Sequence, residues 1–191
     1  MDIKAMKTDL RQEYLSKRAA LPAEEKRQRD EKINRLILSS ASFRYANTVL
    51  AYFPRESEID VRPVLLEALA LGKRVALPRV EGEHRMTYRL IESFDGLMPG
   101  AFGILEPGAD APVYVERAGD TSLCLVPGVI FDVHGFRIGY GGGYYDRFLH
   151  DYNGASAGIV YRDFILPSLP HGRFDLALPV MITDGGIVCA K

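Results

Sequence analysis

A glycine-rich segment, Arg137 to Asp146, has the residue types and the spacing to bind a polyanion. Four of the five residues from Gly139 to Gly143 are glycine, an arginine precedes them, and two tyrosines and an aspartate follow. Glycine lets the backbone take positive φ and lets a ligand approach closely. Free backbone N–H groups beside an arginine suit a phosphate, and Asp146 could hold the metal ion that accompanies a nucleotide. The segment predicts phosphate binding, with a structural glycine turn as the alternative.

Two familiar phosphate-binding motifs are excluded at this segment. No Gly-Lys-Ser/Thr follows the glycines, so the segment is not a Walker A element. The glycine spacing also misses G-x-G-x-x-G, the dinucleotide-binding fingerprint. A different kind of nucleotide site has to be considered.

The longer segment from Pro127 to Asp146 reads PGVIFDVHGFRIGYGGGYYD. It fits the pattern P-G-x-x-F-D-x-x-G-x-R-x-G-x-G-x-G-Y-Y-D at every fixed position. This pattern resembles the hallmark of the 5-formyltetrahydrofolate cyclo-ligase family, also called 5,10-methenyltetrahydrofolate synthetases. The resemblance spans nearly the whole chain, because three further segments match as well: Lys7-x-x-x-Arg11, Glu58-Ile59-Asp60 and Pro78-Arg79.

The resemblance implies a ligase that forms a C–N bond. Its reaction would be the ATP-dependent cyclisation of 5-formyltetrahydrofolate to 5,10-methenyltetrahydrofolate, with release of ADP and phosphate. The γ-phosphate would pass to the formyl oxygen, and N10 would then attack the activated carbon. The implied ligands are ATP, the folate and Mg²⁺, and no covalent protein nucleophile is required.

The resemblance also implies roles for individual residues. The expected ATP-binding set is Lys7, Arg11, Arg137, Gly139, Gly141, Gly142, Gly143, Tyr144 and Tyr145. Within that set Arg137 and Tyr145 are expected to be catalytic. The expected folate-binding set is Glu58, Asp60, Tyr140, Gly141, Gly142, Gly143 and Tyr144. The expected Mg²⁺ ligands are Asp146 and Asp175.

Each of the charged candidates also has a plainer interpretation. Lys7 and Arg11 lie four residues apart on one helix face, with Arg18 seven further on, and this spacing also fits a solvated basic face. Either acid of the pair at 58 and 60 could contact the pterin, and Asp60 is also placed to cap the helix that follows. Asp132 could equally accept hydrogen bonds from loop amides. His134, beside the glycine loop, has no assigned role.

Composition restricts the remaining possibilities. The 191 residues predict a single domain over 1–191, and the net charge of −1 provides no global field for nucleic acid or a membrane. The N-terminus lacks the apolar stretch of a signal peptide, which indicates a cytoplasmic protein, expected to be a monomer. Cys124 and Cys189 are expected to be buried free thiols.

The elements that must position these residues alternate along the chain. Helical spacing covers residues 2–20, a second helix follows Pro22, and a third covers 61–71. Strands are expected at 48–53, 74–77, 86–91, 123–126, 157–161 and 179–183, with mostly loop and short β pieces over 93–118 and a helix starting at 144–149. This alternation predicts an α/β protein, a three-layer α/β/α domain with a largely parallel sheet. By resemblance, the fold is that of ribose-phosphate isomerases and CoA transferases.

The order of strands and loops predicts where the ligands bind. In such sheets ligands gather at the carboxyl ends of strands. The segments at Pro54, Pro78 and Pro127 are each expected to follow a strand, so they could meet at one crevice.

Two other functions are compatible with the predicted fold. One is an isomerase or transferase acting on sugar phosphates or CoA esters, which fold similarity alone does not exclude. The other is a folate- or nucleotide-binding protein without turnover. The glycine loop followed by Tyr-Tyr-Asp favours the ligase, and the presence of every expected site residue argues against an inactive protein.

Overall fold

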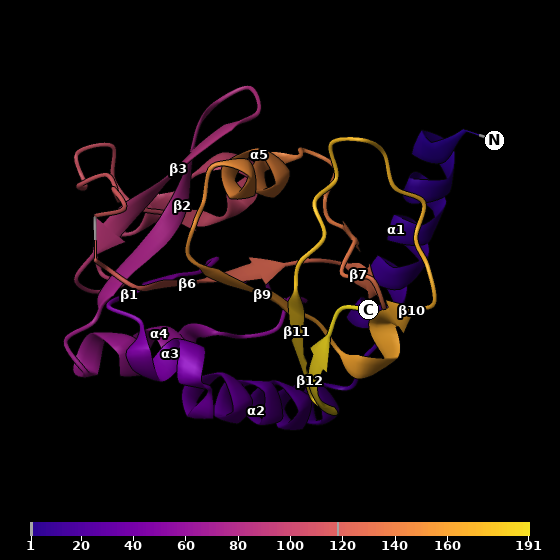
Figure 1. Ribbon diagram of the computed structural model, residues 1–191, viewed down its shortest axis with the longest axis horizontal. Helices are drawn as coiled ribbons and strands as arrows, with labels where there is room; N and C mark the ends of the chain where they lie inside the picture. The colour runs from indigo at the N-terminus through magenta and orange to yellow at the C-terminus, as the bar shows by residue number, and fades with distance from the viewer. Residues whose placement is uncertain (1, 118) are drawn as a thin grey trace.

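The computed structural model describes residues 2–117 and 119–191 and is built on one large β-sheet (Figure 1). The sheet has seven strands in the order β12-β11-β9-β6-β1-β2-β3. In chain order these are β1 (Thr48–Leu50), β2 (Arg74–Gly82), β3 (Arg85–Ile91), β6 (Ser122–Pro127), β9 (Ala155–Ile159), β11 (Val180–Thr183) and β12 (Gly186–Cys189).

The centre of the sheet is parallel and its two edges are antiparallel. Strands β2, β1, β6, β9 and β11 pair in parallel, whereas β3 and β12 run antiparallel to their neighbours. All three residues of β1 are buried, as are the first five of β6. Such continuous burial is expected of parallel strands, because helices cover both faces of a parallel sheet.

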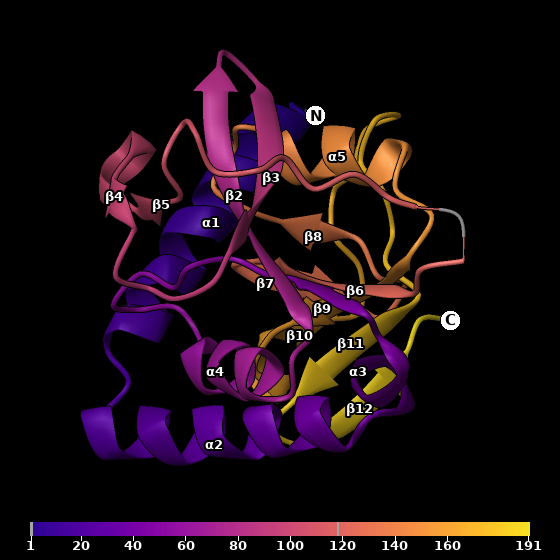
Figure 2. The same cartoon turned by 90° about the vertical axis from the view of Figure 1, so that its left-hand side faces the viewer.

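Helices and a small second sheet form the outer layers (Figure 2). One face of the sheet carries α2 (Ala23–Ser39), α3 (Ala41–Tyr45) and α4 (Arg62–Ala70). The other side carries α5 (Tyr144–His150), which packs on β3, and α1 (Ile3–Ala19). The layers confirm the predicted mixed α/β class and the mostly parallel sheet.

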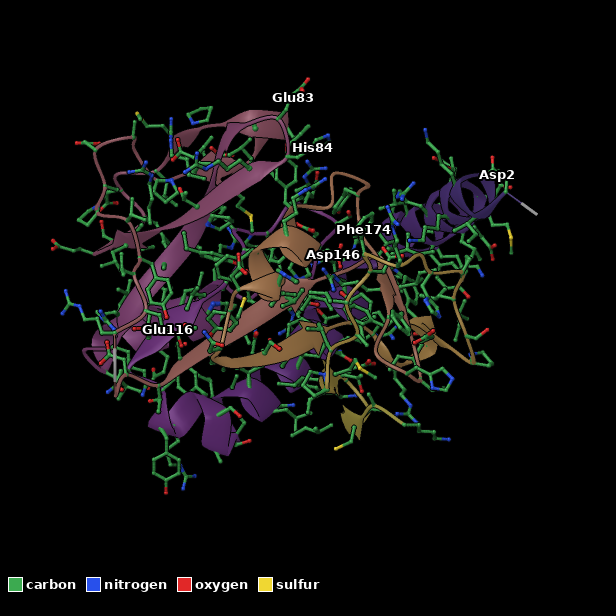
Figure 3. All side chains as sticks on the ribbon, turned by 45° about the horizontal axis from the view of Figure 1, so that its top comes forward. Asp2, Glu83, His84, Glu116, Asp146 and Phe174 are labelled. Atoms are coloured by element: carbon green, nitrogen blue, oxygen red, sulfur yellow. The ribbon has the colours of Figure 1, made fainter. Side chains whose placement is uncertain are left out.

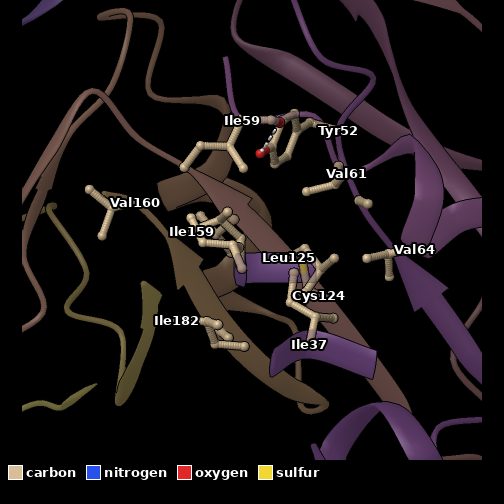
Figure 4. Close-up of a cluster of buried hydrophobic side chains, with 14 of the residues drawn as sticks. Ile37, Tyr52, Ile59, Val61, Val64, Cys124, Leu125, Ile159, Val160 and Ile182 are labelled. Atoms are coloured by element: carbon tan, nitrogen blue, oxygen red, sulfur yellow. Dashed lines mark hydrogen bonds between the residues drawn. The ribbon is translucent and has the colours of Figure 1, made fainter. Parts of the chain in front are cut away.

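The core fills the space between the sheet and its helices, and Figure 4 shows part of it. Ile37 of α2 and Val64 of α4 lie with Leu125 of β6, Ile159 of β9 and Ile182 of β11, and all five side chains are buried. Burying one such aliphatic side chain stabilises the fold by roughly 1.5–3 kcal/mol before the entropy cost. The core therefore fixes the strands whose ends carry the candidate site.

The second sheet was not expected from the sequence. It has three strands in the order β10-β7-β8, formed by Ile165–Leu166, Ile130–Asp132 and Arg137–Ile138. The strand directly before the glycine loop is therefore β8 rather than β6. The chain reverses between β7 and β8 at Gly135, whose φ is +87°. A Cβ at this position would lie 2.0 Å from the Leu178 carbonyl oxygen, so only glycine fits.

Several short elements were also not predicted. They are α3, β12 and the 3₁₀ turn Ala101–Gly103. The short β pieces expected within 93–118 are present as β4 (Met98–Pro99) and β5 (Leu105–Glu106). A second 3₁₀ turn spans Arg162–Phe164. Segments this short contain too few residues to show a hydrophobic period.

The expectation that Pro78 follows a strand is wrong, because Pro78 lies inside β2. Strand β2 pairs with β1 only from Arg74 to Ala76, whereas it pairs with β3 as far as Gly82. At Pro78 one side of β2 thus has no strand partner. Proline is tolerated there because its missing N–H leaves no pairing unmade.

The expectation that both thiols are buried is half wrong. Cys124 of β6 is buried and free, whereas Cys189 is free but exposed. Strand β12 is an edge strand in which half-buried and exposed residues alternate, and Cys189 falls on the exposed side.

Among the residues that the structure describes, no helix is both long and apolar enough to cross a membrane.

Candidate functional site

The glycine loop joins β8 to α5 and uses positive φ at two of its glycines. Gly141 has φ +100° and Gly143 has φ +66°, and Gly143 is the residue from which α5 begins. A side chain is strained in this region of φ, so the sequence places glycine where the backbone requires it. At Gly142 a Cβ would lie 2.5 Å from the Tyr144 ring. The glycines at 142 and 143 therefore leave room for the side chains of Tyr144 and Arg147, which lie against the loop.

Helix α1 brings two basic side chains to this side of the molecule. The Lys7 Nζ lies 2.5 Å from an Oδ of Asp175, and the Arg11 Nε donates to the Gly139 carbonyl oxygen at 2.6 Å. Burial lowers the pKa of the Arg11 guanidinium. Arg11 thus contacts the glycine loop and Lys7 contacts the Asp175 segment, so the two residues are not spread over a solvated face.

Arg137 precedes the glycine loop and Asp146 follows it, and the two form an ion pair. The Arg137 side chain is almost fully buried, and its Nη2 lies 3.0 Å from Asp146 Oδ1. Its other terminal nitrogen donates to the Leu176 carbonyl oxygen, and the Leu176 N–H donates to Asp146 Oδ1. Two segments 30 residues apart are thereby held together, and Figure 3 shows Asp146 close to Phe174 of the second segment.

The carboxylates of Asp146 and Asp175 are each only half engaged. In both, one oxygen accepts hydrogen bonds, from Arg137 and Leu176 N–H in Asp146, and from Lys7 and Gly172 N–H in Asp175. Within residues 2–117 and 119–191, the second oxygen of each accepts no hydrogen bond from the protein. Burial raises the pKa of Asp175, but the hydrogen bonds from Lys7 and the Gly172 N–H outweigh it and bring the pKa below its usual value. In the described part of the chain, no group of three or more His, Cys, Asp or Glu side chains forms a ready metal site.

Glu58 and Asp60 of the 54–60 loop line a cavity of about 1020 Å³ between this loop, the end of α1 and helix α2. Glu58 is almost fully buried, and one of its carboxylate oxygens accepts the Arg55 N–H at 2.8 Å. Asp60 accepts the Arg62 N–H at 3.0 Å and is ion-paired with the Arg62 side chain. Burial raises the pKa of Asp60, but these bonds from Arg62 leave it below its usual value. Asp60 thus accepts the first N–H of α4 from one residue before the N-cap position, which Val61 occupies without a side-chain cap bond.

The 58–60 segment is held in place by a buried acid that the sequence did not reveal. One oxygen of Asp30, on α2, accepts the Asp60 N–H at 3.1 Å and pairs with Lys26 at 2.7 Å. The other oxygen accepts the Tyr161 hydroxyl at 2.6 Å. The acceptor that Asp30 presents to the loop is therefore fixed from two sides. No spacing rule connects Asp30 with Asp60, 30 residues away.

Tyr140 connects the glycine loop, to which it belongs, with the 54–60 loop and the end of α1. Its hydroxyl accepts a hydrogen bond of 2.5 Å from Arg18, and the Arg55 guanidinium lies 4.5 Å from the centre of its ring. Arg18 and Arg55 both line the large cavity. Arg18 could have been found from its seven-residue spacing to Arg11, whereas Arg55 carried no signal.

The two tyrosines after the loop point to different surroundings. The Tyr144 ring lies 6.5 Å from His84 and 6.3 Å from Phe102, between ring centres, and it lines a second cavity of about 550 Å³. His84 lies at the tip of the β2–β3 hairpin, as Figure 3 shows. The Tyr145 hydroxyl is buried and has no hydrogen-bond partner among the described residues. Burial raises the pKa of Tyr145. One ring thus faces a cavity and the other packs against the core.

Asp132 and His134 have contacts that explain them structurally. Asp132 is buried and accepts the backbone N–H groups of His134, Phe136 and Leu169 at 2.9–3.0 Å. This is the amide-acceptor interpretation of Asp132. His134 is exposed, with one ring nitrogen 3.5 Å from the Lys191 carbonyl oxygen.

Comparisons with known proteins agree with this geometry. Residues 3–184 match the model of the 5-formyltetrahydrofolate cyclo-ligase family. A probable 5-formyltetrahydrofolate cyclo-ligase of Caenorhabditis elegans is 28% identical, over 96% of this chain and 95% of its own length. A 5-formyltetrahydrofolate cyclo-ligase of Mycolicibacterium smegmatis is 34% identical, over 75% of this chain and 77% of its own.

A solved structure is also similar over nearly its whole length. The NMR structure of 5,10-methenyltetrahydrofolate synthetase from Aquifex aeolicus superposes with a TM-score of 0.84 at 33% identity, covering 97% of this chain and 93% of that one. The match to the family model, the similar fold and the intact Pro127–Asp146 segment lead to one conclusion. The chain belongs to the 5-formyltetrahydrofolate cyclo-ligase family.

Proposed function

We propose that this protein catalyses the ATP-dependent cyclisation of 5-formyltetrahydrofolate to 5,10-methenyltetrahydrofolate, with release of ADP and phosphate. Membership of the family supports the overall reaction. The observation that carries the assignment to this site is that Arg11 and Arg137 contact the glycine loop or its flanking Asp146, while Lys7 pairs with Asp175 in the segment bound to Asp146. These cations and the loop can receive a triphosphate.

The chemistry requires activation of a poor leaving group. Transfer of the γ-phosphoryl group of ATP to the formyl oxygen breaks the bond between the γ-phosphorus and the bridging oxygen, and ADP leaves. N10 then attacks the formyl carbon, closes the ring and loses its proton. Cleavage of the bond between carbon and the phosphorylated oxygen expels phosphate. In such a reaction the protein mainly positions two substrates and neutralises phosphate charge.

The ATP side of the site has cations whose present partners are exchangeable. Lys7 and its partner Asp175 are both partly exposed, so an incoming phosphate can replace the carboxylate at the Lys7 ammonium. Arg11 is bound to a neutral carbonyl, which leaves its charge uncompensated by that bond. We assign the phosphates to Lys7, Arg11, Arg137 and the amides from Gly139 to Tyr145. Arg137 and Tyr145 are our candidates for the residues nearest the reacting atoms.

Asp146 and Asp175 fit Mg²⁺ by the chemistry of their donors. Magnesium prefers hard oxygen ligands, and beside substrate phosphates it takes only one or two carboxylates. Each of these aspartates has an oxygen that accepts no hydrogen bond from the described protein residues. When bound, the ion would neutralise charge on the transferring phosphoryl group.

The folate side is assigned to the large cavity and its border with the glycine loop. Its volume of about 1020 Å³ is in the range of sites for large organic ligands. Glu58 and Asp60 provide carboxylates for the N–H donors of a pterin ring, and Glu58 has one oxygen that accepts no hydrogen bond within the described residues. Tyr140, Tyr144 and the glycines 141–143 complete the proposed contacts with the folate.

The test is an absorbance assay for 5,10-methenyltetrahydrofolate. The protein should form this product from 5-formyltetrahydrofolate only when both ATP and Mg²⁺ are present. Product without ATP, or no product under any condition, contradicts the proposal. Folate binding without turnover would indicate a binding protein instead.

We further propose that the protein acts in the cytoplasm as a monomer, without nucleic acid or membrane. The net charge of −1 supports the absence of nucleic acid and membrane as partners, because it provides no general attraction to polyanionic surfaces. Light scattering after size exclusion should give the mass of one chain, 21.3 kDa. A dimer mass contradicts that part of the proposal.

A further inference from the structure

Arg18 is a buried cation that pairs with no acid among the described residues. Only 4% of its surface is exposed, and its Nε has no hydrogen-bond acceptor in the part of the chain that the structure describes. Within residues 2–117 and 119–191, no carboxylate lies within ion-pairing distance of its guanidinium. Taking an arginine out of water without a counter-charge is costly. Its retention at the site calls for a function.

The acceptors of Arg18 come from three separate segments. Its Nη2 donates to the Tyr140 hydroxyl at 2.5 Å and to the Ser57 Oγ at 3.4 Å, and its Nη1 donates to the Gly128 carbonyl oxygen at 3.3 Å. Tyr140 belongs to the glycine loop, Ser57 to the loop that lines the large cavity, and Gly128 to the turn after β6. One planar guanidinium therefore joins the two halves of the proposed site.

The position of Arg18 on α1 adds to this connection. The same helix contacts the proposed phosphate region through Lys7 and Arg11, about three and two turns before Arg18. Arg55, from the cavity loop, also stacks on the Tyr140 ring. Tyr140 and the cavity loop both accept hydrogen bonds from Arg18. A ligand that moves either one therefore also disturbs the guanidinium that holds the other.

We propose that Arg18 is a positioning residue that couples folate binding to nucleotide binding. The proposal rests on the proposed function, because it assigns the folate to the cavity and ATP to the glycine loop. Ordering of either loop by its ligand orders the guanidinium, and this pre-orders the other loop. Such coupling is reciprocal, and its usual size is about 5- to 150-fold in affinity.

The experiment measures the dissociation constant of 5-formyltetrahydrofolate with and without a saturating non-hydrolysable ATP analogue. The ratio of the two constants reports the coupling and cancels any direct loss of folate contacts. The natural protein should bind folate at least about fivefold more tightly when the analogue is present. In Arg18→Met and in Tyr140→Phe this ratio should fall to about one. Arg35→Met is the matched control, because Arg35 is exposed on α2, and it should keep the full ratio.

Tyr140→Phe keeps the ring and removes only the hydroxyl, so it decides the question even if Arg18→Met fails to fold. A ratio near one in the natural protein overturns the proposal, and so does a full ratio in either site variant. A merely structural role for Arg18 would lower the melting temperature and leave the ratio unchanged. If the natural protein turns over normally but the site variants keep its full ratio, only this inference is contradicted. Absence of turnover in the natural protein contradicts the proposed function as well.

Discussion

Lys7 and Asp146 illustrate how single residues of the site are held before any ligand arrives. Lys7 is paired with Asp175, and Asp146 with Arg137, so each cation already faces a carboxylate. A phosphate or metal ion that binds to a member of these two ion pairs must therefore replace the present partner of that residue. The expected energetic effect of each residue is therefore a difference between two paired states.

The two candidate magnesium ligands give the first prediction at this scale. Asp146→Asn and Asp175→Asn should each lower turnover by about 2–4 kcal/mol, roughly 30- to 1000-fold, because one charged ligand of the phosphoryl-transfer site is lost. Asparagine keeps an oxygen for Arg137 or Lys7, so thermal unfolding should change little. Turnover measured over a Mg²⁺ titration checks both points. Near-normal rates for Asp175→Asn at limiting Mg²⁺ would remove Asp175 from the proposed set.

The pKa of Asp175 gives a prediction about pH. Hydrogen bonds from Lys7 and the Gly172 N–H bring this pKa below its usual value of 3.8 despite the opposing effect of burial. The folded protein then binds fewer protons at this group than the unfolded chain does, so its stabilisation is complete above the unfolded pKa. It is lost as pH falls through the lower folded pKa.

Lys7→Met should raise the pKa of Asp175 toward its usual value. The stabilisation from this group should then be smaller, and acidification should remove it at a higher pH. Carbon NMR of the Asp175 carboxyl group during an acid titration measures the change. Lys17→Met is the matched control, since Lys17 pairs with Glu13 on the exposed side of α1. An unchanged Asp175 titration in Lys7→Met would contradict the assigned cause.

At the scale of elements, the glycine loop owes its shape to φ values that other residues rarely adopt. Gly141→Ala and Gly143→Ala should each cost about 1 kcal/mol or more of stability, because both residues have positive φ. They should also weaken binding of the ATP analogue and spare folate binding, if the loop backbone contacts phosphate. Calorimetric titration with each ligand checks this.

Gly72→Ala provides the control for backbone strain. Gly72 follows α4 with φ +71°, and no atom lies within 4 Å of a Cβ built there. This variant should show a similar loss of stability with unchanged ligand affinities. Equal ATP affinity in all three variants would show that the glycine loop is only structural.

The long, periodic elements were readable from the sequence, whereas the short ones were not. Helix α1 and strand β6 carry enough apolar residues at one period to be recognised, and the structure has them within two residues of the expected bounds. Strand β8 has only two residues and depends on pairing with β7, which the local sequence does not encode. The glycine loop was therefore located correctly but attached to the wrong preceding strand.

The site was predictable where a motif lies contiguous in the chain and unpredictable where contacts are distant. Arg137 and Asp146 stand in one segment, and the structure pairs them. Asp30 and Arg55 were missed, because a hydrogen bond across 30 residues or a stacking contact across two loops depends on the tertiary fold. The ligand roles of all these residues stay predictions.

At the scale of the whole molecule, one sheet connects nearly every part of the chain. Strand β1 lies at its centre between β2 and β6, and buried residues from four helices and most strands form a continuous core. This continuity supports our prediction that residues 1–191 form a single domain. Single domains of this kind usually unfold cooperatively.

The protein should therefore show one calorimetric unfolding transition. A ligand present at about 100 times its dissociation constant should stabilise the native state by about 2.7 kcal/mol, which raises the melting temperature by roughly 5–10 °C for a chain of this size. ATP with Mg²⁺ and 5-formyltetrahydrofolate should each shift the whole transition. Two separate transitions, of which a ligand shifts only one, would contradict the single-domain prediction.

The two cysteine thiols give the protein a built-in reporter of its own opening. Burial raises the pKa of the Cys124 thiol to about 12, so at neutral pH it is protonated as well as shielded, whereas Cys189 is exposed. An alkylating reagent should therefore modify Cys189 at once and Cys124 only when β6 separates from its neighbours. Mass spectrometry of the second modification over time then measures the rate of local opening of the central sheet. Bound nucleotide should slow that second event and leave the first unchanged.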